Sequence, residues 1–210
     1  MKNNYNPQRR QLIKKSSRLM GLAALSGVAG KGLADTESTE APAEELPQYG
    51  IEGLEAPELD VNYWINADGK ESSFSIDENR GKWIFLKCFQ NWCPGCHASG
   101  FPTLKAFANE FHEHPKVAIA GIQTVFEGFH HNTQDDVREL QLKYELPITM
   151  GHDAGDPDGL SISDTMLKFR TGGTPWLILI NPDGVVAYND FRVNTTKLIQ
   201  FMHEEVGFHG

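Results

Sequence analysis

The sequence of 210 residues contains few cysteines and no long hydrophobic segment, and both shortages narrow the possible classes of protein. Its three cysteines, Cys88, Cys93 and Cys96, allow one disulfide and one spare thiol. Because no cysteine precedes Cys88, we do not expect a lipid-modified cysteine near the N-terminus. The weakly apolar run over residues 19–30 is shorter than the ~20 residues that a transmembrane helix needs. The mature protein is therefore not expected to be a membrane protein.

Acidic residues are absent from positions 1–34, whereas seven of the 19 basic residues fall there. The pair Arg9-Arg10 precedes the apolar run, and small residues at positions 32 and 34 suit a cleavage site. Lys31, close to that site, is typical of signals that avoid the general secretion route. The pattern predicts a twin-arginine signal peptide over residues 1–34 and export to a bacterial periplasm. A general secretion signal that happens to contain two adjacent arginines is the alternative.

The chain beyond the predicted signal is strongly acidic. Cleavage after Ala34 would leave 12 basic and 28 acidic residues, a formal charge of −16. Such a surface repels nucleic acid, which is therefore not an expected partner. Residues 35–55 are acidic and poor in large apolar groups, which predicts a disordered linker. Residues 56–210 suffice for one domain with a substantial core.

The middle of the chain has the pattern of a β-α-β unit. Residues 82–89 form an almost continuous apolar run, as in a strand covered on both faces. Apolar residues then recur at helical spacing over residues 96–112, with Pro102 as a predicted kink. Residues 117–125 predict a second buried strand, and the crossover should be right-handed.

The flanking segments predict an α/β fold with a mixed central sheet. A hairpin at the entry to the domain is expected around the turn at residues 66–69. The remaining predictions are a helix over residues 134–145 with Thr133 as its cap, a strand over 147–150, a loop over 151–161, a short helix over 164–169, strands over 176–180 and 185–191, and a closing helix over 195–205.

The segment QNWCPGCH, residues 90–97, fits two motifs, a dithiol pair WCxxC and a haem attachment site CxxCH. It lies where the first buried strand gives way to a helix. There the free N–H groups and the helix dipole stabilise a thiolate at Cys93, and Pro94 suits the first helical position. Cys96, one turn further, can resolve a mixed disulfide formed at Cys93. The haem interpretation also needs a distal ligand, for which Met150, Met166 and Met202 are available but equally suited to the core.

A second motif makes the dithiol interpretation specific. WCPGC after a buried strand, with Thr174-Pro175 before another strand and an NPDG turn, resembles the thioredoxin-fold proteins of the TlpA-like periplasmic branch. The resemblance extends from residue 56 to the C-terminal helix. It implies an N-terminal β-hairpin, an inserted central helix and a cis Pro175 beside the two cysteines. It also implies that the Thr174 backbone pairs with an extended substrate, next to Trp92 and Gly95.

The same resemblance implies an activity. TlpA-like proteins are thiol–disulfide oxidoreductases, most of them reductases of disulfides in exported proteins that receive electrons from a membrane thiol–disulfide donor. They need no bound cofactor. Cys93 would be the nucleophile and Cys96 the resolving thiol, with Trp92, Pro94, Gly95, Thr174 and Pro175 positioning the substrate.

Some positions depart from that family pattern. Lys87 replaces a buried acid, and we expect its ammonium either to reach the surface or to tune the Cys93 pKa. Ser99-Gly100 precedes Phe101-Pro102, where a glutamate is common in reductases of cytochrome maturation. His97 is either a tuner of the Cys93 thiolate or a solvent-facing side chain. Cys88 is expected to be an inert core thiol.

Two other classes share the fold and stay open as alternatives. Copper-delivery proteins would use the thiolates with a distant histidine, and His130, His131 and His152 are expected in loops. Their cysteines, however, are typically spaced by three residues rather than two. A peroxidase of the peroxiredoxin class would need its reactive cysteine in a loop rich in Thr and Pro, which is not present here.

Overall fold

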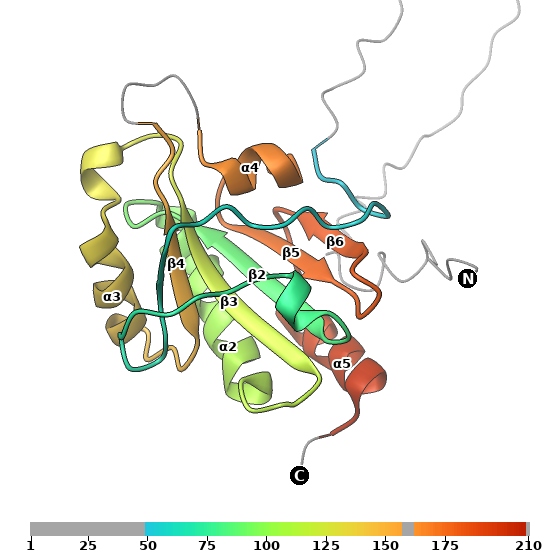
Figure 1. Cartoon of the computed structure of the whole chain (residues 1–210). Coiled ribbons are helices and arrows are strands. Elements are labelled where there is room, and N and C mark those ends of the chain that lie inside the picture. Colours follow the sequence, from blue (N-terminus) through green and yellow to red (C-terminus); the bar gives the residue numbers. More distant parts are fainter. Residues whose placement is uncertain (1–48, 157–161, 209–210) are drawn as a thin grey trace, which may run out of the picture. The chain divides into compact units, whose positions relative to one another are not determined.

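The computed structural model describes residues 49–156 and 162–208 (Figure 1). The predicted signal peptide and the linker up to residue 48 lie outside this part of the chain. The predicted linker extends too far, because residues 49–55 already pack on the domain. Ile51 is buried, Gly50 donates its N–H to the Arg170 carbonyl, and Glu55 forms a β-bridge with Val185. Within the described ranges no helix is long and apolar enough to span a bilayer.

A six-stranded mixed sheet forms the centre of the fold, in the order β1-β4-β3-β2-β5-β6. The adjacent strands β2, β3 and β4 run parallel to one another, as the β-α-β pattern predicts, and β1, β5 and β6 are antiparallel to their neighbours. The strands are β1 (Tyr63–Ile65), β2 (Trp83–Phe89), β3 (Val117–Thr124), β4 (Thr149–Asp153), β5 (Trp176–Ile180) and β6 (Val186–Asp190).

Helices and the N-terminal segment cover the two faces of this sheet. Figure 1 shows α2 (Phe101–Phe111) and α5 (Thr195–Val206) behind it, whereas the segment before β1 crosses its front. The helix α3 (Gln134–Lys143) packs on the same core as α2, and α4 (Asp164–Phe169) packs through Phe169 on the opposite one. Three short turns complete the fold, η1 (Asp77–Asn79), η2 (Cys96–Gly100) and η3 (Phe129–His131). The fold is thioredoxin-like, α/β class.

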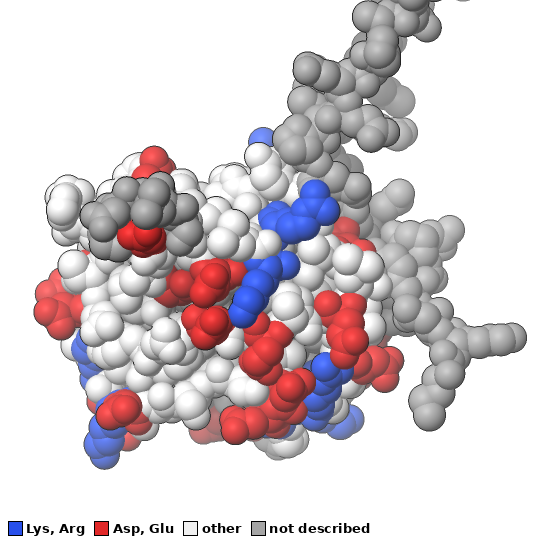
Figure 2. All heavy atoms as spheres, turned by 45° about the horizontal axis from the view of Figure 1, so that its top comes forward, with Lys and Arg blue, Asp and Glu red and all other residues white. Residues whose placement is uncertain are grey.

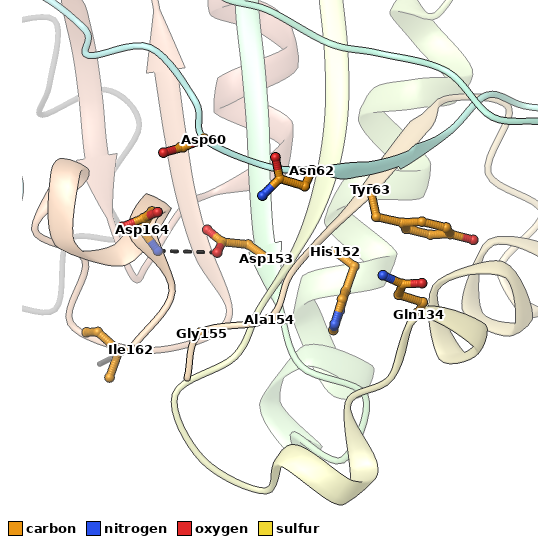
Figure 3. Close-up of a pocket in the computed structure, with 10 residues that line it drawn as sticks. All are labelled: Asp60, Asn62, Tyr63, Gln134, His152, Asp153, Ala154, Gly155, Ile162 and Asp164. Atoms are coloured by element: carbon orange, nitrogen blue, oxygen red, sulfur yellow. Dashed lines mark hydrogen bonds between the residues drawn. The ribbon is translucent and has the colours of Figure 1, made fainter. Parts of the chain in front are cut away.

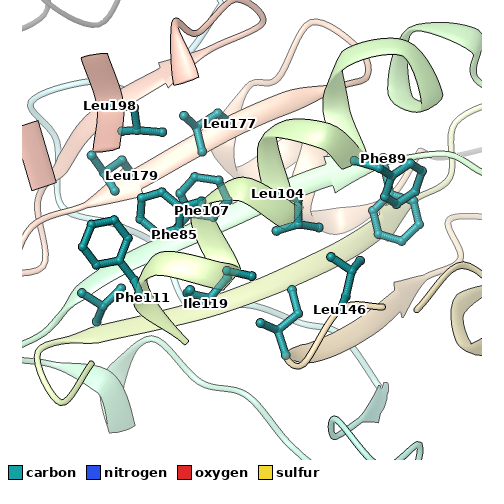
Figure 4. Close-up of a cluster of buried hydrophobic side chains, with 14 of the residues drawn as sticks. Phe85, Phe89, Leu104, Phe107, Phe111, Ile119, Leu146, Leu177, Leu179 and Leu198 are labelled. Atoms are coloured by element: carbon teal, nitrogen blue, oxygen red, sulfur yellow. The ribbon is translucent and has the colours of Figure 1, made fainter. Parts of the chain in front are cut away.

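Each face of β2 contributes to a separate core because successive strand residues point to opposite faces. Phe85 and Phe89 belong to the cluster under α2, where the Phe85 and Phe107 rings stack at 4.0 Å (Figure 4). Leu86 and Cys88 belong to the cluster on the other face. Both faces are covered, which explains why β2 contains one polar residue, Lys87, and no alternation of polar and apolar residues.

The entry hairpin is shorter than the sequence predicts. The turn at residues 66–69 is present, and Ser72 donates its N–H to the Trp64 carbonyl. The returning segment makes one bridge, between Ile65 and Glu71, and is otherwise not a strand. β1 pairs instead with β4, where Trp64 faces Gly151. The loop predicted from residue 151 is also wrong, since β4 continues to Asp153.

Candidate active site

Cys93 lies at the junction of β2 and the helix that leads into α2. Pro94 is the first helical residue, as predicted from its missing N–H. Cys93 acts as the helix cap: its Sγ lies 3.3 Å from the N–H of Cys96, which is also 3.0 Å from the Cys93 carbonyl. A sulfur that receives a helical N–H is positioned to carry negative charge.

The two thiols of the motif differ in access. Cys93 keeps 8% of its surface exposed and Cys96 none. Trp92, which is 43% exposed, and Pro94 form the solvent-facing surface next to Cys93. A partner can therefore reach Cys93 alone, over a rim of Trp92 and Pro94.

The loop before β5 closes the other side of the site. The Thr174–Pro175 bond is cis, as the family resemblance implies, and the Thr174 carbonyl lies 3.5 Å from Cys93 Sγ. Pro175 packs directly against two glycines of the helix start. A Cβ added at Gly95 would lie 3.3 Å from the proline ring, and one added at Gly100 would lie 2.8 Å from it.

The helix that carries the motif changes its winding beneath this contact. Residues Cys96–Gly100 form a π-helical turn, and the α-helical winding of α2 begins at Phe101. Pro102 lies in the first turn of α2, where its missing N–H interrupts the helical hydrogen bonds. The sequence predicts an irregularity of the helix at Pro102. In the structure this irregularity is a π-helical turn just before Pro102, and the turn places Gly100 against Pro175.

Burial controls the protonation of the inner thiol. It raises the pKa of Cys96 to about 12, and the hydrogen bond with Cys93 adds to this effect, whereas the Gln90 backbone N–H opposes it. Cys96 is therefore a thiol in the resting site. Its use as a nucleophile requires a neighbouring positive charge or a way to release its proton.

Lys87 does not reach the surface, and the prediction that it snorkels is wrong. Only 2% of it is exposed, because it lies in the middle of β2, on the face that α2 covers, between Gly121 of β3 and Leu177 of β5. Burial lowers its pKa to about 8, and interaction with the Cys88 and Cys96 thiols in their charged forms partly opposes this shift. The buried Lys87 ammonium is therefore close enough to interact electrostatically with Cys96, the resolving thiol.

His97 has a structural role that the motif alone does not indicate. Its Nδ1 lies 2.6 Å from the Tyr144 hydroxyl, and its Nε2 contacts the Asn91 carbonyl. Phe101 stacks on Tyr144 at 4.3 Å. Of the two alternatives for His97, the solvent-facing one does not hold, because the residue is half-buried and both ring nitrogens are bonded to groups other than the thiols.

The remaining candidate ligands lie apart from the motif. Cys88 is fully buried on the other face of the sheet, as predicted, and burial raises its pKa to about 12. His152 lies in β4 rather than in the predicted loop, whereas His130 and His131 lie in η3. Within the described ranges no three His, Cys, Asp or Glu side chains are grouped to hold a metal ion. Met150, Met166 and Met202 are all core residues.

Sequence reasoning missed the residues that hold the loop before Cys93. Asn132 Oδ1 accepts the backbone N–H of Asn91 at 2.8 Å, and Asn132 Nδ2 donates to Gln90 Oε1 at 3.1 Å. Trp92 Nε1 donates to the same Gln90 oxygen at 3.3 Å. No sequence motif marks Asn132. It lies 39 positions after Cys93, and a single buried asparagine is not part of any repeating pattern of polar and apolar residues. The sequence marked Gly100 only as a departure from the family pattern before Phe101-Pro102, and its contact with Pro175 was not predicted.

Several solved structures share this fold. A thioredoxin-like superfamily protein is 28% identical over 75% of this chain and 98% of its own, with a TM-score of 0.64. A thiol-disulfide isomerase from Corynebacterium glutamicum is 26% identical over 73% of this chain and 97% of its own, with a TM-score of 0.63. The thioredoxin domain of a thiol-disulfide oxidoreductase from Bacteroides vulgatus, 18% identical over 74% and 98% with a TM-score of 0.54, supports the fold alone. No protein with a curated description matches the chain.

The fold and these similarities define the class as thioredoxin-like thiol–disulfide oxidoreductases. Within it, residues 53–189, more than half of the chain, match the sequence profile of the AhpC/TSA family. The chain belongs to that family. Its place in the TlpA-like branch stays a prediction.

Replacing Gly100 with Ala should damage the site, because the added methyl group would lie 2.8 Å from Pro175 Cβ and backbone must move. We expect a loss of about 1–3 kcal/mol in the free energy of unfolding and a rate of disulfide reduction lowered by about tenfold or more. Urea denaturation and a disulfide-reduction assay measure the two effects. Ser99→Ala, at the exposed neighbouring position, is the control. Wild-type values for Gly100→Ala would show that this contact does not shape the site.

Replacing Lys87 with Met should stabilise the protein at pH 7, by about 3 kcal/mol, because Met carries no charge to bury. The gain should shrink as the pH rises from about 8 to 10.5. In that range unfolded Lys87 keeps its proton whereas folded Lys87 has lost it, so wild-type stability rises relative to the variant. Urea denaturation at pH 7, 9 and 10 measures the difference, with exposed Lys70→Met as control. A difference that does not change with pH would contradict a buried, charged Lys87.

Proposed function

We propose that this thioredoxin-fold oxidoreductase exchanges disulfides through Cys93 and Cys96 and that it reduces disulfides of exported proteins. The observation that carries the proposal is the position of Cys93 Sγ, which lies 3.3 Å from the Cys96 N–H and 3.5 Å from the Thr174 carbonyl. In the first contact the sulfur accepts a helical N–H, and in the second it donates to the backbone carbonyl of the cis-proline loop.

The exchange proceeds in two steps. The Cys93 thiolate attacks one sulfur of the substrate disulfide, a mixed disulfide forms, and the other substrate sulfur leaves and takes up a proton. Cys96 then loses its proton and attacks Cys93 Sγ, which releases the second substrate thiol. The enzyme ends with a Cys93–Cys96 disulfide, and the substrate has gained two electrons and two protons.

The buried residues beneath the motif support this order of events. The accessible Cys93 is suited to the first attack, and the enclosed Cys96 is suited to the second, which is intramolecular. Positive charge on Lys87 favours the Cys96 thiolate at the moment of that second attack. The proposed direction, reduction of the partner disulfide, rests on the resemblance to the TlpA-like branch, most of whose members are reductases.

The substrate would lie along the surface formed by Trp92, Pro94, Gly95 and the Thr174-Pro175 pair. Because the Thr174 side of this surface is backbone, an extended substrate segment can bond to it regardless of side-chain sequence. The periplasm, where disulfides persist, is the compartment in which such a reductase has substrates. Since its own disulfide must be reduced again, the proposed partner on the other side of the cycle is a membrane thiol–disulfide electron donor.

Replacing Cys93 with Ser should abolish disulfide reduction, because Cys96 is fully enclosed and cannot attack a substrate directly. Cys96→Ser should instead accumulate a mixed disulfide with the substrate, visible as an added mass that a reductant removes. A coupled reduction assay and intact-protein mass spectrometry distinguish the two variants. Cys88→Ser is the matched control and should keep most of the activity. Activity in Cys93→Ser, or no trapped adduct in Cys96→Ser, would refute the assigned roles.

Replacing both Arg9 and Arg10 with Lys should prevent export while the positive charge of the signal is preserved. A twin-arginine signal needs the two guanidinium groups, whereas a general secretion signal needs only the charge. The fraction of the full chain recovered from the periplasm of a bacterial host reports the result. Replacing Lys14 and Lys15 with Arg is the control. Unchanged export of the double lysine variant would show that the general route is used.

A further inference from the structure

The Trp92 side chain is held in place although 43% of the residue is exposed. Its indole Nε1 donates to Gln90 Oε1 at 3.3 Å. The ring also lies against Gly128, where an added Cβ would be 2.8 Å from Nε1 and 3.0 Å from Cδ1. Gly128 has a φ of +62°, a left-handed backbone that glycine adopts without strain. The indole is therefore fixed by contacts on two sides.

The acceptor of the indole N–H is a buried amide oxygen with two donors. Gln90 is fully buried, and its Oε1 also accepts a hydrogen bond from Asn132 Nδ2 at 3.1 Å. Because an amide oxygen has two lone pairs, the Trp92 and Asn132 donors saturate it. These donors also decide which end of the amide faces them, since the NH₂ end accepts from neither. Gln90 therefore cannot turn without losing both bonds.

Asn132 connects this arrangement to the central sheet. Its Oδ1 accepts the Asn91 backbone N–H at 2.8 Å and the Gln123 Nε2 group at 3.4 Å. Gln123 Oε1 lies 2.7 Å from His152 Nδ1, and the His152 ring points toward Gln134 near the end of β4 (Figure 3). The hydrogen bonds thus run from β4 through β3 to the loop before the motif, which gives the Gln90 amide a rigid support.

The other end of the Gln90 amide has no partner. Nε2 is buried and makes no hydrogen bond within the described part of the chain. An unpaired buried donor destabilises a folded protein, whereas a methionine of similar length would carry no such donor. Without Gln90, Asn132 Nδ2 would still have the Gly128 carbonyl as an acceptor at 2.9 Å. Stability alone therefore does not explain a glutamine at this position, but its oxygen has a defined use in holding the indole.

We propose that Gln90 is a positioning residue that fixes the Trp92 indole as one wall of the substrate groove, and that it serves the binding of peptide substrates rather than the chemistry at Cys93. This inference rests on the proposed disulfide exchange, since it concerns the substrate of the same site. The opposite wall is the cis-proline loop, whose Thr174 carbonyl lies 3.5 Å from Cys93 Sγ. A peptide between the two walls contacts the indole, whereas a small disulfide reaches Cys93 without that contact. An indole that is already held loses little freedom on binding, which favours affinity.

The experiment compares the wild-type protein with Gln90→Met, Trp92→Phe and the double variant. Each pre-reduced protein is mixed with a fluorescent peptide that contains one disulfide and, separately, with hydroxyethyl disulfide as a small probe. Gln90→Met should raise the half-saturating peptide concentration about threefold to tenfold, as expected for one lost hydrogen bond. The limiting rate with the peptide and the rate with the small probe should stay within about twofold of wild type. Trp92→Phe, which removes the indole N–H, should have the same effect, and Gln90→Met should add nothing to it.

Two further measurements separate positioning from a loss of structure. The urea midpoint of unfolding of Gln90→Met should equal or exceed that of wild type, because the unpaired donor is removed. The Trp92 indole proton should exchange with water faster in NMR spectra of this variant, because its acceptor is gone. Gln200→Met, which replaces an exposed glutamine of α5, is the matched control and should behave as wild type in every assay.

Several outcomes overturn the proposal. A half-saturating peptide concentration that does not change in Gln90→Met would refute it, and so would equal losses with the peptide and the small probe. Effects of Gln90→Met and Trp92→Phe that add in the double variant would show that Gln90 does not act through the indole. A clearly lower unfolding midpoint would assign Gln90 a structural role instead. A wild-type protein that reduces neither disulfide would refute the proposed function itself, and the indole exchange would still decide whether Gln90 fixes Trp92.

Discussion

The contact of cis Pro175 with the start of the motif helix is the constraint on which the site depends. It joins Cys93 to Thr174, which lie 81 positions apart, and it places the cysteine sulfur within hydrogen-bond distance of the Thr174 backbone carbonyl, which accepts from it. Gly95 and Gly100 permit the contact because neither carries a Cβ. The π-helical turn places Gly100 under the proline, and the Asn132 hydrogen bonds fix the loop on the other side of Cys93. On the face of the molecule seen in Figure 2, acidic side chains outnumber basic ones.

The second constraint is the buried charge beneath the motif. Lys87 and Cys96 lie in the same dry layer between β2 and the helix, and their environments shift the two groups in opposite directions: the pKa of Lys87 is lowered to about 8 and that of Cys96 is raised to about 12. The neutral forms are favoured for both groups by the same burial. Each becomes easier to charge when the other is charged, since the attraction between them is weakly screened there. A lysine at this position therefore costs stability and supplies the charge that the second attack requires.

The sequence predicted the elements whose residues are fully covered, and it missed those that depend on a distant partner. The apolar run at residues 176–180 and the short helix at 164–169 have the predicted bounds, because burial on both faces and a capping serine leave clear local patterns. His152 follows a glycine and resembles a loop residue, yet pairing with β1 and β3 makes it part of a strand. Lys87 was expected at the surface because charge is expensive to bury. Only the positions of the covering helix and the neighbouring strands reveal that it is enclosed.

The proposed function depends on a Cys93–Cys96 pair that donates two electrons to a partner disulfide. The reduction potential of the purified mature protein, measured against a glutathione series by the alkylation of free thiols, tests this claim most directly. We predict a two-electron couple with a potential well below the ~−120 mV of a strong oxidant, near the ~−270 to −200 mV of reductive dithiols. The couple should be lost in Cys93→Ser and in Cys96→Ser. A potential close to ~−120 mV, or a couple that persists without either cysteine, would contradict it.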